Sequence, residues 1–196
     1  MNARRFLITG ASRGIGHATA VRMAANGDTP VGLARTVPQD FPGEFLAVDL
    51  ADRNATDDAL RKVLSNGPID GVLNNVGIVN PQGLGEIKLD QWDAVQDITV
   101  RTAIQAVQAA LPGMKDRGWG RIINISSENA MQPYEDESPY NACKAAIINF
   151  SKCLSRIYGK EKILVNTVSP AYIETPMTDA MMEELAEKRN SSEQEA

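Results

Sequence analysis

Cysteine, histidine and long apolar runs are scarce in this chain of 196 residues. Its two cysteines, Cys143 and Cys153, lie ten residues apart on one predicted helix, about 15 Å along the axis, too far for a disulfide bond. The single histidine, His17, has no cysteine or histidine at the spacing of metal ligands, so no metal site is predicted. Gly10 interrupts the apolar residues 6–8 too early for a signal peptide or a membrane-spanning helix.

An excess of positive charge is also missing. The chain has 20 Lys and Arg against 25 Asp and Glu, a net charge of -5, which argues against nucleic acid or an anionic membrane as its partner. Its content of 43% hydrophobic and 23% charged residues predicts a single globular domain over residues 1–189. We expect a cytoplasmic protein, with a polar tail at 190–196 that is disordered.

Short apolar runs alternate with helical stretches along the chain. This alternation predicts a doubly wound parallel sheet of at least six strands, an α/β Rossmann fold. The predicted strands are 5–9, 30–34, 44–48, 71–74, 120–126 and 163–168. The predicted helices are 14–26, 55–64, 89–115, 138–158 and 178–188.

A glycine-rich turn joins the first predicted strand to the first helix. Gly10, Gly14 and Gly16 let the backbone approach an anion, and the start of the helix offers unpaired amides and a favourable dipole. Such a turn alone is weak evidence, because glycines also end strands in proteins that bind no nucleotide. Its position between a strand and a helix favours a dinucleotide site.

The end of the second predicted strand indicates which dinucleotide is bound. An acid there accepts hydrogen bonds from the ribose 2'-hydroxyl, whereas a base pairs with a 2'-phosphate. The chain has Arg35 at this point and Arg13 in the glycine turn, so we expect NADP(H) to be preferred over NAD(H). The alternative is that both arginines are ordinary surface residues.

Tyr140 and Lys144 carry the acid/base chemistry that the sequence suggests. They lie four residues apart on the predicted helix 138–158 and therefore share one face, and Tyr140 follows Ser127 by 13 residues. A cation beside a phenol eases loss of the phenolic proton. A surface pair on an amphipathic helix is the alternative, and Ser127 together with the glycine turn argues against it.

Five motifs occur in the order and spacing of one protein family. They are Thr9-Gly10-x-x-x-Gly14-x-Gly16, Asn74-Asn75-Val76-Gly77, Ser127, Tyr140-x-x-x-Lys144 and Asn166-x-x-Ser169-Pro170. In these motifs the chain resembles the short-chain dehydrogenase/reductase family over residues 5–177. The resemblance implies an oxidoreductase that interconverts a carbonyl and a secondary alcohol, takes a small ketone or alcohol, and assembles as a homodimer or homotetramer.

The resemblance also implies roles for the catalytic residues. Tyr140 gives its proton to the substrate oxygen during reduction, and Ser127 donates a hydrogen bond to the same oxygen. Lys144 lowers the pKa of the phenol and holds the ribose hydroxyls of the cofactor. Further cofactor contacts carry over to Ser12, Ile15, Asp49, Leu50, Asn75, Val76, Gly77, Pro170, Ile173 and Thr175. The plain alternative for both Asp49 and Thr175 is a helix cap.

Three features depart from the family pattern. Thr99 stands where the family commonly has an asparagine that holds a water on the proton path from the lysine. Ala171 replaces a glycine, and we expect strain if the backbone needs a positive φ there. The usual seventh strand has no counterpart, so we expect the chain to be incomplete.

The substrate is only weakly indicated. Glu128, Glu135, Asp136 and Glu137 lie between Ser127 and Tyr140, and negative charge at the mouth of a site disfavours acyl-carrier or CoA substrates. A solvated loop that points away is the alternative, and a 3-oxoacyl thioester stays the alternative substrate. A rival from another class is a catalytically weak relative that binds a dinucleotide as a sensor or an interaction module.

Overall fold

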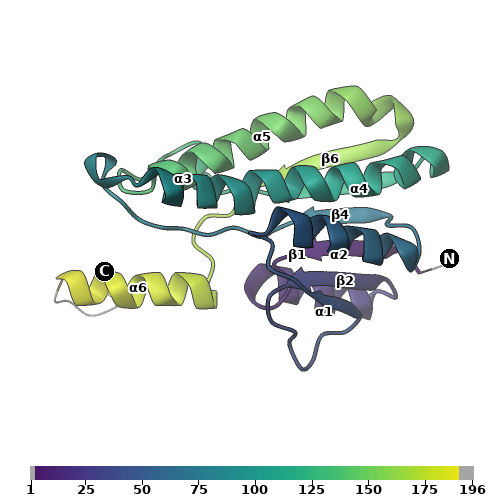
Figure 1. The fold of residues 1–196 in the computed structure, drawn as a ribbon, viewed down its shortest axis with the longest axis horizontal. Helices are drawn as coiled ribbons and strands as arrows, with labels where there is room; N and C mark the ends of the chain where they lie inside the picture. The colour runs from purple at the N-terminus through teal and green to yellow at the C-terminus, as the bar shows by residue number, and fades with distance from the viewer. Residues whose placement is uncertain (1–2, 190–196) are drawn as a thin grey trace.

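The computed structural model describes residues 3–189, which form one six-stranded sheet with helices on both faces (Figure 1). The order of the strands in space is β3-β2-β1-β4-β5-β6, and all neighbours pair in parallel. The strands are β1 (Arg5–Thr9), β2 (Thr29–Ala34), β3 (Glu44–Ala47), β4 (Gly71–Asn74), β5 (Gly120–Ile125) and β6 (Ile163–Val168). The predicted doubly wound α/β fold is confirmed, and each predicted strand end differs by at most one residue.

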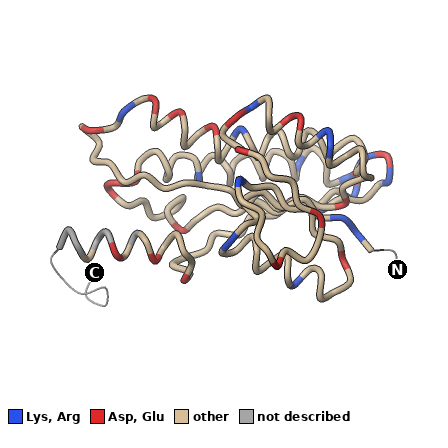
Figure 2. The backbone as a smooth tube through the Cα atoms, turned by 60° about the horizontal axis from the view of Figure 1, so that its bottom comes forward, with Lys and Arg blue, Asp and Glu red and all other residues tan. Residues whose placement is uncertain are grey.

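The helices are α1 (Gly14–Ala25), α2 (Arg53–Ser65), α3 (Leu89–Gln96), α4 (Thr102–Arg117), α5 (Ser138–Tyr158) and α6 (Pro176–Arg189). None of the described helices is both long and apolar enough to cross a bilayer. Acidic and basic residues are interspersed along the described chain (Figure 2). The polar tail predicted at 190–196 lies outside the described residues.

The prediction of one continuous helix over 89–115 was wrong. A π-helical turn at Asp97–Arg101 separates α3 from α4. The Arg101 guanidinium donates hydrogen bonds to the backbone oxygens of Leu50 and Ala51, at 3.0 and 2.9 Å. These are contacts with a segment about 50 positions earlier in the sequence, so periodicity within the helix cannot reveal them.

The two faces of the sheet pack into separate cores because side chains alternate along each strand. Leu7 of β1 belongs to a core with α2, α4 and α5, in which Leu60, Val107 and Leu154 are buried. Ile8, the next residue, packs with Ala20 of α1 on the opposite face. The order of the strands reverses between β1 and β4, and in such sheets the crevice at the carboxyl ends of these strands binds ligands.

Candidate active site

A cleft of about 560 Å³ opens at the carboxyl ends of the strands. All of the predicted site residues line it except Gly16 and Thr99. The lining residues predicted from sequence are Gly10, Ser12, Arg13, Gly14, Ile15, Arg35, Asp49, Leu50, Asn75, Val76, Gly77, Ser127, Tyr140, Lys144, Pro170, Ile173 and Thr175. Residues from opposite ends of the chain thus meet at one crevice.

The turn between β1 and α1 needs glycine for two different reasons. Gly10 has a φ of +68°, a conformation that residues with a side chain rarely adopt. A Cβ on Gly16 would lie 2.4 Å from the Gly10 oxygen and 2.7 Å from Nδ2 of Asn75, so Gly16 is required by packing. Asn75 completes the turn by donating hydrogen bonds to the backbone oxygens of Thr9 and Gly10, both at 3.1 Å.

The start of α1 is suited to a phosphate group. No side chain caps this helix, because Arg13 at the N-cap position makes no capping hydrogen bond. The first amides of α1 therefore keep their hydrogen-bonding capacity beside the cleft, and the helix dipole favours an anion there. The turn fits the diphosphate of a dinucleotide, with Gly10, Ser12 and Ile15 along the wall that would hold it.

The two candidate 2'-phosphate ligands lie on this part of the cleft wall. Arg13 and Arg35 both line the cleft and are both exposed, and Ala34 ends β2 without an acidic neighbour. Asp49 also lines the cleft, and its carboxylate accepts a hydrogen bond from the Ala51 amide at 3.0 Å. The helix cap considered for Asp49 is made instead by Asp52 at the start of α2.

Ser127, Tyr140 and Lys144 come together where β5 ends and α5 begins. Lys144 is only 3% exposed, and its Nζ donates a hydrogen bond to the Ile125 oxygen at 2.8 Å. The same Nζ lies 5.3 Å from the centroid of the Tyr140 ring. Burial lowers the pKa of Lys144 to about 8, although nearby Cys143 acts in the opposite direction.

The pKa of Tyr140 is raised, whereas its spacing from Lys144 predicts a lower pKa. Burial is the main cause, because removing a phenolate from water disfavours the charged form. Ser127 opposes the rise through a side-chain hydrogen bond, and the charge of Glu137 adds to it. The phenol is therefore held in its protonated form, which is the form that donates a proton to a carbonyl.

Thr99 does not line the cleft, but its side chain lies close to Gly77, which does. A Cβ on Gly77 would be 3.5 Å from the Nζ of Lys144 and 3.8 Å from Oγ1 of Thr99, so both side chains approach this glycine. Thr99 is 3% exposed, and its Oγ1 has no hydrogen-bond partner among the described residues. Its hydroxyl and the Lys144 ammonium group thus share Gly77 as a neighbour.

The segment before α6 closes one side of the cleft. Thr175 lines the cleft, and its Oγ1 also accepts a hydrogen bond from the Thr178 amide at 3.3 Å, as an N-cap does. The helix cap considered for Thr175 is therefore present, and its contact with the cofactor stays a prediction. The strain considered for Ala171 is absent: among the described residues Lys162 is the one non-glycine residue with a positive φ.

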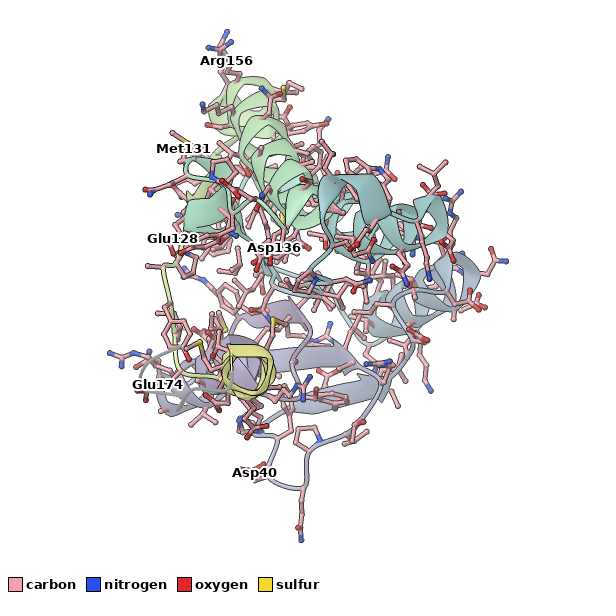
Figure 3. The ribbon with its side chains drawn as sticks, turned by 90° about the vertical axis from the view of Figure 1, so that its left-hand side faces the viewer. Asp40, Glu128, Met131, Asp136, Arg156 and Glu174 are labelled. Atoms are coloured by element: carbon pink, nitrogen blue, oxygen red, sulfur yellow. The ribbon has the colours of Figure 1, made fainter. Side chains whose placement is uncertain are left out.

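Sequence reasoning missed several residues at the site. Ile78 and Ile98 supply apolar parts of the cleft wall. The acidic segment before α5 does not behave as one exposed group: Glu135 and Asp136 are exposed, whereas Glu137 is only 7% exposed. Figure 3 shows Glu128 and Asp136 below α5 and Glu174 on the segment that leads to α6. Glu137 pairs with Gln82, far away in the sequence, so a local sequence pattern cannot predict its burial.

Comparison with known proteins identifies the family. Residues 4–186 match the family described as short chain dehydrogenase. The chain belongs to the short-chain dehydrogenase/reductase family. Members of this family are oxidoreductases that bind a nicotinamide dinucleotide, as the solved structures below illustrate.

Individual relatives differ in their substrates. Acetoacetyl-CoA reductase of Cupriavidus necator is 33% identical over 96% of this chain and 82% of its own length. L-xylulose reductase of Mus musculus is 35% identical over 89% of this chain and 73% of its own length. The structure of L-sorbose reductase of Gluconobacter frateurii with NADPH and L-sorbose has a TM-score of 0.87 and 32% identity, covering 95% of this chain and 76% of that one.

A further solved structure is a 3-oxoacyl (acyl-carrier-protein) reductase of Agrobacterium tumefaciens with NADP bound. It has a TM-score of 0.86 and 25% identity, and it covers 94% of this chain and 76% of that chain. The relatives thus include reductases of sugars and of acyl thioesters.

Proposed function

We propose that this protein is an NADP(H)-dependent oxidoreductase that interconverts a carbonyl and a secondary alcohol. The observation that carries the proposal is the meeting of Ser127, Tyr140 and Lys144 at one cleft with the uncapped glycine turn. Bound NADP(H) supplies or accepts the hydride. The side chains of this protein are then required to move one proton and to stabilise one oxygen.

Tyr140 is the general acid in reduction. Burial keeps its phenol protonated at neutral pH, so it can donate to the oxygen of a ketone as negative charge develops there. Ser127 provides a second hydrogen-bond donor to the same oxygen. We propose that Lys144 and the Thr99 hydroxyl, which both approach Gly77, form the route by which the proton is replaced. The alcohol is oxidised by the same groups in reverse.

Arg35 and Arg13 support NADP(H) over NAD(H). Both lie on the cleft wall, and a guanidinium can bind a 2'-phosphate with two parallel hydrogen bonds. Two similar solved structures were determined with NADP or NADPH, which agrees with this preference.

The proposed substrate is a neutral or cationic small ketone or alcohol. Glu135 and Asp136 remain exposed on the loop before α5, and their charge disfavours the phosphates of CoA or of an acidic carrier protein. A 3-oxoacyl thioester is the alternative, because acetoacetyl-CoA reductase is among the similar proteins. We further propose that the protein is cytoplasmic. We also propose that it forms a homodimer or homotetramer, and light scattering after size-exclusion chromatography would test this oligomeric state.

The test of the proposed function is turnover of NADPH with a panel of ketones, sugars and acetoacetyl-CoA. We expect Tyr140→Phe to lower kcat by at least about 100-fold, because the general acid is lost while the ring is kept. Tyr158→Phe, at the other end of α5, is the matched control and should keep full activity. Tight NADPH binding without turnover by the unaltered protein would instead support the dinucleotide-binding sensor.

A further inference from the structure

A buried carboxylate, that of Glu137, is linked through Asn129 to Ser127 but is not itself one of the proposed catalytic residues. Glu137 is 7% exposed, and no described Lys or Arg forms an ion pair with it. Its Oε2 accepts a hydrogen bond from Nδ2 of Asn129 at 2.7 Å. Burial of an acid without a cation is costly, so this position calls for a specific role.

The Glu137 backbone is held in place by a distant segment. Gln82, in the loop after β4, forms an isolated β-bridge with Glu137, and its amide donates to the Asp136 oxygen at 2.6 Å. The Asn141 amide of α5 also donates to the Glu137 oxygen at 2.9 Å. The carboxylate is therefore presented to Asn129 from a fixed backbone.

The orientation of the Asn129 amide follows from its neighbours. Asn141 donates through Nδ2 to the Tyr134 oxygen at 2.7 Å, so its Oδ1 faces Asn129 as an acceptor, at 3.2 Å. The Glu137 carboxylate is the second acceptor on this side. Both contacts require the NH₂ group of Asn129, because a reversed amide would oppose oxygen to oxygen. Asn129 must therefore turn its oxygen toward Ser127.

The Ser127 hydroxyl is consequently held by two hydrogen bonds, one to the side chain and one to the backbone of Asn129. Its Oγ accepts from the Asn129 backbone amide at 3.2 Å and donates to Oδ1 of Asn129 at 3.1 Å. These two contacts set the rotamer of the hydroxyl. The hydroxyl carries a single proton, so when Ser127 donates to a substrate oxygen the Asn129 backbone amide still holds its Oγ in place.

We propose that Asn129 and Glu137 are positioning residues that hold Ser127 in its catalytic rotamer through the chain Glu137, Asn129, Ser127. The inference rests on the proposed function, because it assigns a purpose to the Ser127 hydroxyl. This role also distinguishes Glu137 from the exposed acids beside it. Glu137 does not line the cleft, so it acts on the serine through Asn129 and does not repel substrates at the mouth of the cleft.

A double-mutant cycle tests this link. We expect Glu137→Ala to lower kcat by about tenfold to 100-fold through misplacement of the serine, with the NADPH dissociation constant unchanged. In the Ser127→Ala background the same substitution should cost nothing further. Glu137→Gln keeps an oxygen that can accept from Asn129, so its kcat should stay within about threefold of that of the unaltered enzyme. Glu135→Ala, an exposed acid of the same loop, is the control and should leave kcat unchanged.

Other outcomes would overturn the assignment. An equal loss of kcat with and without Ser127 would mean that Glu137 is merely structural, and no loss would mean that it does not position the serine. If Glu137→Ala does not fold, Asn129→Ala enters the same cycle with the same expectation. Absence of any turnover in the unaltered protein would contradict the proposed function but would leave the hydrogen-bonded link from Glu137 to Ser127 untouched. The side-chain amide NMR signals of Asn129 would then decide, since they must shift in both Ser127→Ala and Glu137→Ala.

Discussion

At the scale of single residues, Arg35 determines the proposed cofactor preference. It directly follows the last residue of β2, on the cleft wall and exposed. A guanidinium attracts a 2'-phosphate, whereas a carboxylate repels the phosphate and accepts hydrogen bonds from a 2'-hydroxyl. In this proposal the choice between the two cofactors depends mainly on the charge of one exposed side chain.

We expect Arg35→Asp to shift the ratio of kcat/KM for NADPH over NADH toward NADH by at least about tenfold, the equivalent of one charged hydrogen bond. Steady-state kinetics with both cofactors measures this ratio. Arg156→Asp makes the same change of charge near the end of α5, where the side chain points away from the rest of the molecule (Figure 3), and should leave the ratio unaltered. An unchanged ratio in Arg35→Asp would remove the cofactor assignment.

The residues Tyr140 and Lys144 show what spacing can and cannot predict. Four positions on one helix placed them on the same wall of the cleft, as expected. The direction of the pKa change of Tyr140 was not predictable in this way. It depends on how much water the folded chain removes from the phenol, and that burial comes from elements far away in the sequence.

At the scale of elements, the π-helical turn Asp97–Arg101 is the main departure from regular structure. It interrupts a stretch whose sequence is helical throughout, and such turns are frequent at functional sites. Here the turn carries Thr99, whose buried hydroxyl approaches Gly77, as Lys144 does, and has no partner among the described residues. An unsatisfied hydroxyl lowers stability, so its presence suggests a function.

We expect Thr99→Val to separate stability from activity. The substitution keeps the shape and removes the unsatisfied hydroxyl, so the free energy of unfolding should rise by about 1 kcal/mol. If the hydroxyl serves proton supply to Tyr140, kcat should fall by about tenfold while KM stays constant. Urea unfolding and steady-state kinetics measure the two effects. A variant that is more stable and fully active would show that Thr99 has no part in the reaction.

At the scale of the whole molecule, Arg5 connects three parts of the chain at the edge opposite the cleft. Its guanidinium donates to both carboxylate oxygens of Glu44 at the start of β3, at 2.9 and 2.7 Å. It also donates to the Gly67 and Val63 oxygens near the end of α2. Because β2 lies between β1 and β3, this one side chain links strands that do not pair with each other.

We expect Arg5→Met to lower the free energy of unfolding at pH 7 by about 1–2 kcal/mol, a modest value because Glu44 is 37% exposed and water screens the pair. The hydrogen bonds of Arg5 lower the pKa of Glu44 below its ordinary value of 4.5. The ion-pair contribution is therefore complete above pH 4.5 and is lost as the pH falls through the lower folded-state pKa. Urea unfolding at pH 7 and near pH 3 should show a smaller difference between the two proteins at the acidic pH. A difference independent of pH would exclude the Glu44 pair as its cause.

The sequence by itself determined the strands, the glycine turn and the spacing of Tyr140 and Lys144, because these depend on neighbours within a few positions. Periodic apolar runs and glycines with special φ angles are local properties of a chain. Only the tertiary structure decided that Glu137 is buried, that Asn129 faces Ser127, and that the helix after residue 89 is interrupted. Each of these depends on side chains outside the local helix or strand pattern: Gln82 pairs with Glu137, Glu137 and Asn141 orient Asn129, and Arg101 contacts Leu50 and Ala51. Such contacts form only when the chain folds, and burial and hydrogen-bond geometry then determine charge and orientation.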